Sequence, residues 1–156
     1  MAWQQKFTYW WHAFFSRLLY AAKTWTLKAD DERRLRAFET RCYRRLLGIR
    51  WFDKVTNEAV RKKIRREETI VDMVRKQKME LFGHICRMKD ERLLKVVMTG
   101  MVDGSRGRGR PARRWIDDIT KWSNCTVPEA VKKAGDRQEW RAIIEHGTGL
   151  HGPAGT

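Results

Sequence analysis

The feature that most constrains how this chain can fold is a run of alternating glycines and arginines at residues 104–114. Such a run buries little apolar area, and each of its glycines loses backbone entropy on ordering. We therefore expect it to separate two folded parts of the chain. Two interpretations stay open, a nucleic-acid-binding arm and a solubilising linker whose charge has no particular target. Arginine in place of lysine favours the nucleic-acid-binding arm, because a guanidinium donates two parallel hydrogen bonds to a phosphate and also stacks on bases.

The net charge of +15 over 156 residues is extreme for a chain of this size. A compact protein with so much positive charge attracts anions, which makes nucleic acid the first partner to consider and an anionic membrane surface the second.

Residues 108–111, Arg-Gly-Arg-Pro, match the core of an AT-hook, a motif that places arginines along the narrow minor groove of DNA. The match is only four residues long.

Three cysteines, Cys42, Cys86 and Cys125, stand far apart in the sequence. An odd number without paired spacing predicts free thiols in a reducing compartment, and hence a nuclear or cytoplasmic protein. The basic cluster at residues 61–66 could also serve as a nuclear-import signal. His84 and Cys86 are the only metal-like pair, and since a structural zinc site needs four ligands we expect no metal and no cofactor.

Helical periodicity and capping signals predict an all-α chain with no strands. The most clearly marked helix follows a cap at Asp30 or Asp31, buries Leu35, Phe38, Cys42 and Leu46, and ends at Gly48. Further helices are predicted at residues 57–66, 69–88, 91–98, 115–122, 126–135 and 136–144. The helix at 69–88 starts with the capping box Thr69–Asp72, and the helix at 126–135 starts with the capping box Thr126–Glu129. Trp51 and Phe52 are expected to mark a turn and to anchor it as apolar residues, and His84 is expected to be a packing residue.

Residues 3–22 form an aromatic helical face that includes Trp3, Phe7, Trp10 and Phe14. Polar residues interrupt it too often for a signal peptide or a membrane span. A core, a protein partner or a membrane interface could cover this face.

Six blocks of sequence, in a fixed order, cover about residues 16–145. They are Leu18-Leu19-Tyr20; Thr24-Trp25-Thr26-Leu27; Phe38-Glu39 with Arg44-Arg45-Leu46-Leu47-Gly48-Ile49; Phe82-Gly83-His84 with Arg87-Met88; Gly107 to Pro111 with Arg114-Trp115; and Asp136-Arg137 with Trp140-Arg141. The chain resembles, in these blocks, the C-terminal part of reverse transcriptases encoded by non-LTR (LINE-type) retrotransposons. Ala21 and Lys23 depart from the glycine and glutamate usual in that family.

The resemblance implies a helical thumb, which holds the primer and template duplex, followed by a helical C-terminal extension. The expected organisation is an unmatched aromatic helix at 1–15, a thumb-like region at 16–99, a basic linker at 100–113, a helical extension at 114–145 and a disordered tail at 146–156. The resemblance also implies nucleic-acid handling during target-primed reverse transcription.

The resemblance does not imply catalysis by these residues. The family's polymerase holds Mg²⁺ with aspartates of a palm that precedes the thumb, and only about fifteen residues precede the thumb-like region here. Trp115-Ile116-Asp117-Asp118 imitates the catalytic box of the family, but it follows the thumb and lies in a helical pattern. We therefore expect a truncated element product, without palm or endonuclease, that is not an enzyme.

The leading hypothesis is non-specific binding of RNA or DNA phosphates by clustered basic residues. The predicted contacts are Arg41, Arg44, Arg45, Arg61, Lys62, Lys63, Arg65, Arg66, Arg106, Arg108, Arg110, Arg113 and Arg114. A second hypothesis is an inert interaction protein that docks a partner, or a copy of itself, through the aromatic N-terminal face.

Overall fold

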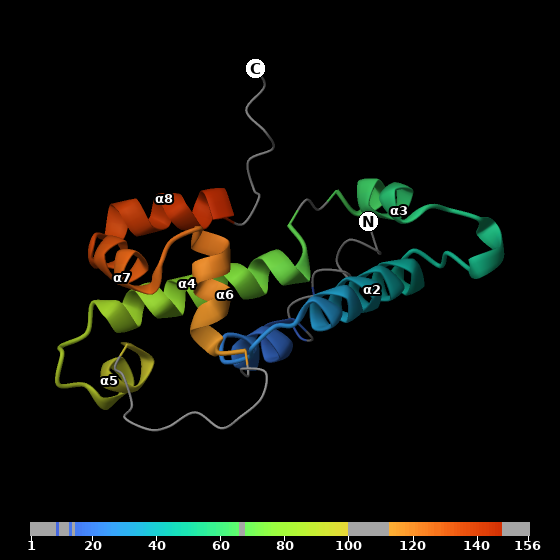
Figure 1. The fold of residues 1–156 in the computed structure, drawn as a ribbon. Coiled ribbons are helices and arrows are strands. Elements are labelled where there is room, and N and C mark those ends of the chain that lie inside the picture. The colour runs from blue at the N-terminus through green and yellow to red at the C-terminus, as the bar shows by residue number, and fades with distance from the viewer. Residues whose placement is uncertain (1–8, 10–12, 14, 66–67, 100–112, 148–156) are drawn as a thin grey trace, which may run out of the picture. The chain divides into compact units, whose positions relative to one another are not determined.

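The computed structural model of the protein describes residues 9, 13, 15–65, 68–99 and 113–147. Every regular element within these ranges is a helix, which confirms the predicted all-α class. Residues 15–22 are helical, and they are followed by α2 (Ala29–Leu46), the 3₁₀ helix η1 (Trp51–Asp53), α3 (Asn57–Ile64), α4 (Ile70–Cys86), α5 (Leu93–Thr99), α6 (Trp115–Ser123), α7 (Val127–Gly135) and α8 (Arg137–Gly147) (Figure 1). None of the helices in the described ranges has the length and apolar character needed to cross a membrane.

The chain divides into two compact units, Met1–Val74 and Arg75–Thr156, and the division falls inside α4. The predicted thumb-like region, residues 16–99, spans this division and stays a prediction. Most of the predicted linker at 100–113 lies outside the described residues, as does the tail beyond Gly147, so both stay predictions.

In the first unit, α2 begins directly after Lys28, whose backbone N–H donates to the Asp31 carboxylate over 3.1 Å. The capping carboxylate therefore lies inside the first turn, whereas the predicted helix began after a cap at Asp30 or Asp31. The helix ends at Leu46, and Gly48 follows with a left-handed φ of 66°, as predicted for a helix-ending glycine.

The buried face of α2 differs from the predicted one. The four predicted apolar positions, Leu35, Phe38, Cys42 and Leu46, are all half-buried. The buried residues are instead Glu32, Glu39 and Tyr43. The Tyr43 hydroxyl donates to Glu39 Oε1 over 2.7 Å, and because a hydrogen-bonded polar pair can be buried, hydrophobic periodicity alone placed the stripe wrongly.

After η1 the chain reverses, and α3 runs back along α2 (Figure 1). Val60 and Ile64 are the buried residues of α3. The predicted capping box at the start of α4 is confirmed, because the Thr69 N–H donates to Asp72 Oδ2 over 3.1 Å and the Asp72 N–H donates to Thr69 Oγ1 over 3.2 Å.

In the second unit, α6, α7 and α8 gather around the C-terminal half of α4 (Figure 1). Their shared core consists of Met79, Phe82, Cys86, Ile116, Ile119, Ala130, Ala134, Trp140 and Ile144. The capping box that begins α7 is confirmed by the Thr126 N–H, which donates to Glu129 Oε2 over 2.8 Å. The Phe82 and Trp140 rings lie 5.3 Å apart between centroids and join α4 to α8.

Two predictions about single residues are wrong. Trp51 and Phe52 lie at a turn, as predicted, but they do not form an apolar anchor, since they are 88% and 55% exposed. His84, expected to be a packing residue, is exposed on α4. In both cases the residue type indicated burial, but the helix or turn places the side chain away from the core.

The predicted aromatic N-terminal face falls largely outside the described residues. Within them, Phe15 and Ala22 are buried, and Tyr20 is 78% exposed with the Lys23 ammonium 5.5 Å from its ring centroid. The hypothesis of a partner docked on this face therefore stays a prediction.

Candidate nucleic-acid interface

A groove in the first unit lies between α2 and α3 and is strongly basic. It has a volume of about 590 Å³ and is open to solvent. Its lining consists of Arg36, Ala37, Thr40, Arg41 and Arg44 from α2, and Asn57, Glu58 and Arg61 from α3. Four arginines thus face a single glutamate, an arrangement suited to a polyanion.

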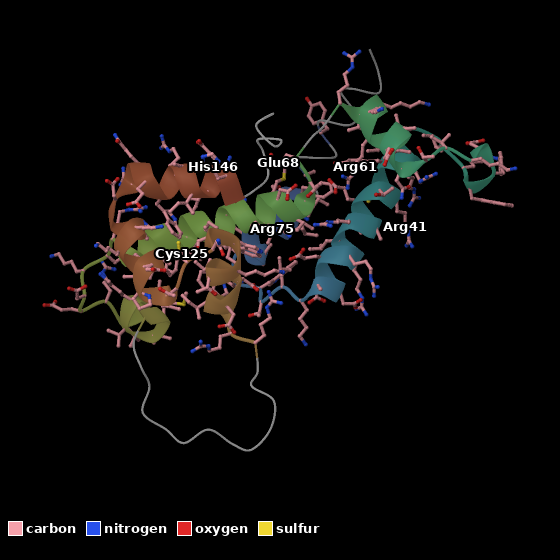
Figure 2. All side chains as sticks on the ribbon, turned by 45° about the horizontal axis from the view of Figure 1, so that its top comes forward. Arg41, Arg61, Glu68, Arg75, Cys125 and His146 are labelled. Carbon is pink, nitrogen blue, oxygen red and sulfur yellow. The ribbon has the colours of Figure 1, made fainter. Side chains whose placement is uncertain are left out.

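Helical geometry explains why the α2 residues meet at this groove. Positions 36, 40 and 44 recur every four residues, as do 37 and 41, so they form neighbouring rows on one side of the helix. Figure 2 labels Arg41 on α2 and Arg61 on α3, the two sides of the groove. Three acidic residues of α2 lie in its first turn, at 30–32, whereas Arg44 and Arg45 lie in its last turn.

Arg44 holds the two sides of the groove together. Its Nη2 donates to the Val55 carbonyl oxygen over 2.6 Å and to Asn57 Oδ1 over 2.9 Å. These bonds join the last turn of α2 to the start of α3. One nitrogen of this guanidinium, Nη2, therefore has a structural role, although the side chain also lines the groove.

Glu39 lies beneath Arg61. The Arg61 Nη2 atom is 4.0 Å from Glu39 Oε2, and the two side chains are 39% and 2% exposed. Glu39 Oε1 also accepts a hydrogen bond from the Ile70 N–H over 3.2 Å. Burial raises the pKa of the Glu39 carboxyl, while the hydrogen bonds from Tyr43 and Ile70 lower it in part. The glutamate thus connects α2 and the start of α4 with an arginine of the groove.

Arg41 differs from the other three arginines of the groove. It is exposed, and among the residues that the structure describes it forms no hydrogen bond or ion pair. Arg36 lies 3.7 Å from Glu32 through Nη2 and Oε2 and is half exposed. Neither Arg36 nor Glu39 is among the functional residues predicted from the sequence. Arg36 could have been identified from the sequence, because positions 36, 40 and 44 follow one another at intervals of four residues and so share one side of the helix.

The structure brings together only some of the predicted contact residues. Arg41, Arg44 and Arg61 line the groove. Arg45, Lys62, Lys63 and Arg65 are exposed in the same unit but do not line it. Arg65 has a left-handed φ of 55° and its N–H donates to the Arg61 and Lys62 carbonyl oxygens, which ends α3. Arg66, Arg106, Arg108 and Arg110 lie outside the described residues.

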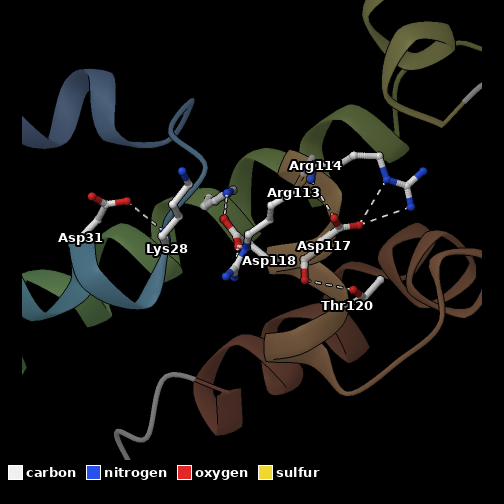
Figure 3. A network of polar contacts seen from close by, with 8 residues as sticks. Lys28, Asp31, Arg113, Arg114, Asp117, Asp118 and Thr120 are labelled. Atoms are coloured by element: carbon white, nitrogen blue, oxygen red, sulfur yellow. Dashed lines mark hydrogen bonds and ion pairs between the residues drawn. The ribbon is translucent and has the colours of Figure 1, made fainter. Parts of the chain in front are cut away.

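The last two predicted residues, Arg113 and Arg114, pair with aspartates of α6 in the second unit (Figure 3). Arg113 Nε donates to Asp118 Oδ1 over 2.9 Å, and Asp118 is fully buried against Lys78. The Arg114 N–H donates to Asp117 Oδ2 over 2.7 Å and caps α6. Both aspartates of the sequence that imitates a catalytic box thus have structural partners.

The chain is 29% identical over 143 residues to an uncharacterized transposon-derived protein of Caenorhabditis elegans, and the match covers 84% of this chain. The match covers 50% of the length of that relative. No family model and no solved structure matches the chain. The similarity supports a relationship to a transposable element.

Proposed function

We propose that the protein binds RNA or DNA through the phosphates, at the groove between α2 and α3, as part of a retrotransposon reverse transcriptase of the non-LTR type. The observation that supports this most directly is the set of four arginines that meet at one groove. The transposon-derived relative and the six blocks of sequence agree with such an origin. The proposed role of these residues is binding of phosphates and includes no chemical step.

The chemistry of the groove favours phosphate over a compact acidic ligand. A guanidinium donates two parallel hydrogen bonds to phosphate oxygens, and the four guanidiniums line an open groove and not an enclosed cavity. A polyanion can lie along such a groove and place several phosphates within reach. Because phosphates carry no base identity, we expect little sequence specificity.

The test is fluorescence anisotropy of labelled RNA–DNA and DNA duplexes, titrated with the whole chain from low to physiological salt. Logarithmic affinity should fall with logarithmic salt, with a slope of about 0.7 to 0.9 for each phosphate neutralised. Arg41→Ala should weaken binding and reduce that slope by about one phosphate equivalent.

Arg33→Ala is the matched control, because Arg33 lies on the same helix, is 82% exposed on its side chain and does not line the groove. It removes one charge but should leave the slope close to that of the wild type. Equal losses for the two variants would mean that only total charge matters and would contradict a site at the groove. Deletion of residues 104–112 separately tests the predicted basic arm and leaves the Arg113–Asp118 pair in place.

A further inference from the structure

The helical turn η1 presents two neighbouring aromatic side chains to solvent. Trp51 is 88% exposed and Phe52 is 55% exposed, and their ring centroids lie 6.0 Å apart with planes at 77°. Large aromatic side chains usually bury most of their surface, and Trp in particular is highly buried on average. In Figure 1 this turn lies beyond the ends of both α2 and α3, at the far end of their pair.

The turn is held in shape by hydrogen bonds between its own residues. The Asp53 N–H donates to the Arg50 carbonyl oxygen over 3.2 Å, and the Arg50 N–H donates to Asp53 Oδ2 over 2.7 Å. Lys54 follows with a left-handed φ of 49°. The aromatic pair is therefore presented by a closed turn, so that a ligand would find the rings already positioned.

The charges around the rings indicate the chemistry of what they contact. Arg50 lies 5.8 Å from the Phe52 ring centroid, and Lys54 flanks the pair on the other side in sequence. Both cations are exposed, while Asp53, the carboxylate that lies between them in sequence, accepts a backbone hydrogen bond of the turn. An apolar protein surface would match the rings but not the cations. A second copy of this chain, with its own excess of 15 positive charges, would be repelled.

We propose that Trp51 and Phe52 stack on unpaired bases of a nucleic acid whose phosphates lie in the α2–α3 groove. Bases offer flat aromatic faces next to phosphates, and stacking on aromatic side chains is the usual way in which proteins hold single strands without reading their sequence. The inference rests on the proposed function and adds to it that the ligand is single-stranded at this end. A duplex with an unpaired overhang combines both requirements.

The experiment compares a labelled single strand with the same strand carrying abasic positions, which keep every phosphate and remove the bases. The whole chain should bind the abasic strand about tenfold more weakly. The double variant Trp51→Ala/Phe52→Ala should lose about tenfold on the normal strand and almost nothing further on the abasic one. Its salt slope should equal that of the wild type, since no cation is removed.

Two controls separate stacking from structural damage. Tyr20→Ala removes another aromatic side chain that is 78% exposed, and it should leave the preference for the normal strand unchanged. Trp51→Phe keeps an aromatic face and should retain most of the preference. Circular dichroism of all variants should match that of the wild type, because the substituted side chains are exposed.

The results distinguish the two proposals. If the wild-type chain binds both strands equally with a steep salt dependence, stacking is refuted and phosphate binding in the groove stands. If it binds neither strand nor a duplex at low salt, both proposals fail. A dimer in light scattering that the double variant converts to a monomer would assign the rings to self-association and overturn the stacking proposal.

Discussion

The indole Nε1 of Trp140 donates to the backbone carbonyl oxygen of Met79 over 2.8 Å, across the gap that Gly83 leaves on α4. A β-carbon at position 83 would lie 2.5 Å from Trp140 Cδ1 and 2.6 Å from Nε1. The ring is itself buried, at 2% exposure, and packs on Phe82. The glycine is thus required by the close approach of α8 to α4.

Gly83→Ala should therefore destabilise the second unit. The added methyl has to displace a ring that is packed and hydrogen-bonded, which we expect to cost about 1–3 kcal/mol of the free energy of unfolding. Urea unfolding followed by circular dichroism measures this change. Gly135→Ala is the control, because nothing lies within 4 Å of its added β-carbon, and its effect should be neutral or slightly stabilising. Equal effects of the two substitutions would contradict the close approach.

The buried ion pair between Lys78 and Asp118 gives a second prediction. Both side chains are fully buried, and Lys78 also lies 4.8 Å from the Trp115 ring centroid and 5.3 Å from that of Trp122. Burial lowers the pKa of the Lys78 ammonium, and the hydrogen bond to Asp118 opposes this. Asp118→Asn leaves a buried cation without its counter-charge, so we expect a loss of about 3–5 kcal/mol in unfolding free energy.

Asp117→Asn is the matched control for that experiment. Asp117 and its partner Arg114 are 39% and 62% exposed, and solvent screens their interaction, so the loss should stay below about 1 kcal/mol. The double variant Lys78→Met/Asp118→Asn should recover part of the stability lost by Asp118→Asn alone, since no buried charge of this pair remains. A double variant less stable than Asp118→Asn alone would be the contrary result.

The buried carboxyl of Glu39 should make the free energy of unfolding depend on pH. Its pKa is raised in the folded state, chiefly by burial, so the folded protein holds this proton more tightly than the unfolded chain. The resulting stabilisation is complete below the unfolded value near 4.5 and is lost as the pH rises through the raised pKa. Glu39→Gln keeps an acceptor for Tyr43 and Ile70 and removes the titration. The wild type should therefore gain stability relative to Glu39→Gln as the pH falls from 7 toward 4.5.

Unfolding in urea at several pH values measures this difference for the two proteins side by side. Only the difference between them matters, because other groups titrate equally in both. A constant difference over this range, or one that favours the glutamine variant increasingly toward acid, would show that the carboxyl of Glu39 is not perturbed in the predicted direction.

Two of the three thiols, Cys86 and Cys125, should differ in reactivity. Cys86 is buried in the core of the second unit, and burial raises its pKa to about 11, so that at pH 8 about one molecule in a thousand carries the thiolate. Cys125 is half-buried beside Lys133, whose Nζ lies 3.4 Å from Sγ. Under iodoacetamide at pH 8, mass spectrometry should find Cys125 alkylated well before Cys86. In urea the two rates should converge, and equal rates in the native protein would contradict the burial of Cys86.

Much of the local structure could be predicted because its causes lie within a few residues of each other. The capping boxes at Thr69 and Thr126 join residues three apart, and Gly48 ends α2 through its own left-handed φ. The basic character of the last turns of α2 and α3 was also evident from residue order. For the candidate site, this was enough to select Arg41, Arg44 and Arg61, but not to show that they share a groove.

The parts that could not be predicted depend on contacts between distant segments. Glu39 meets the Ile70 N–H across 31 positions, and Trp140 meets Met79 across 61. These contacts decide which face of α2 is buried and why position 83 is glycine. Exposure also depends on distant segments. Trp51 and Phe52 are residue types common in protein cores, but they lie on a turn that no described helix covers.

The sequence by itself thus determined the helical class, the ends of most helices and the excess of positive charge, because these follow from propensity, capping and composition along the chain. The tertiary structure alone decided which arginines line a groove, which acids are buried beneath or beside them and which aromatic rings face solvent. The physical reason is that burial and pairing depend on the helix packed opposite a residue, and that neighbour is not encoded in the residue's local sequence.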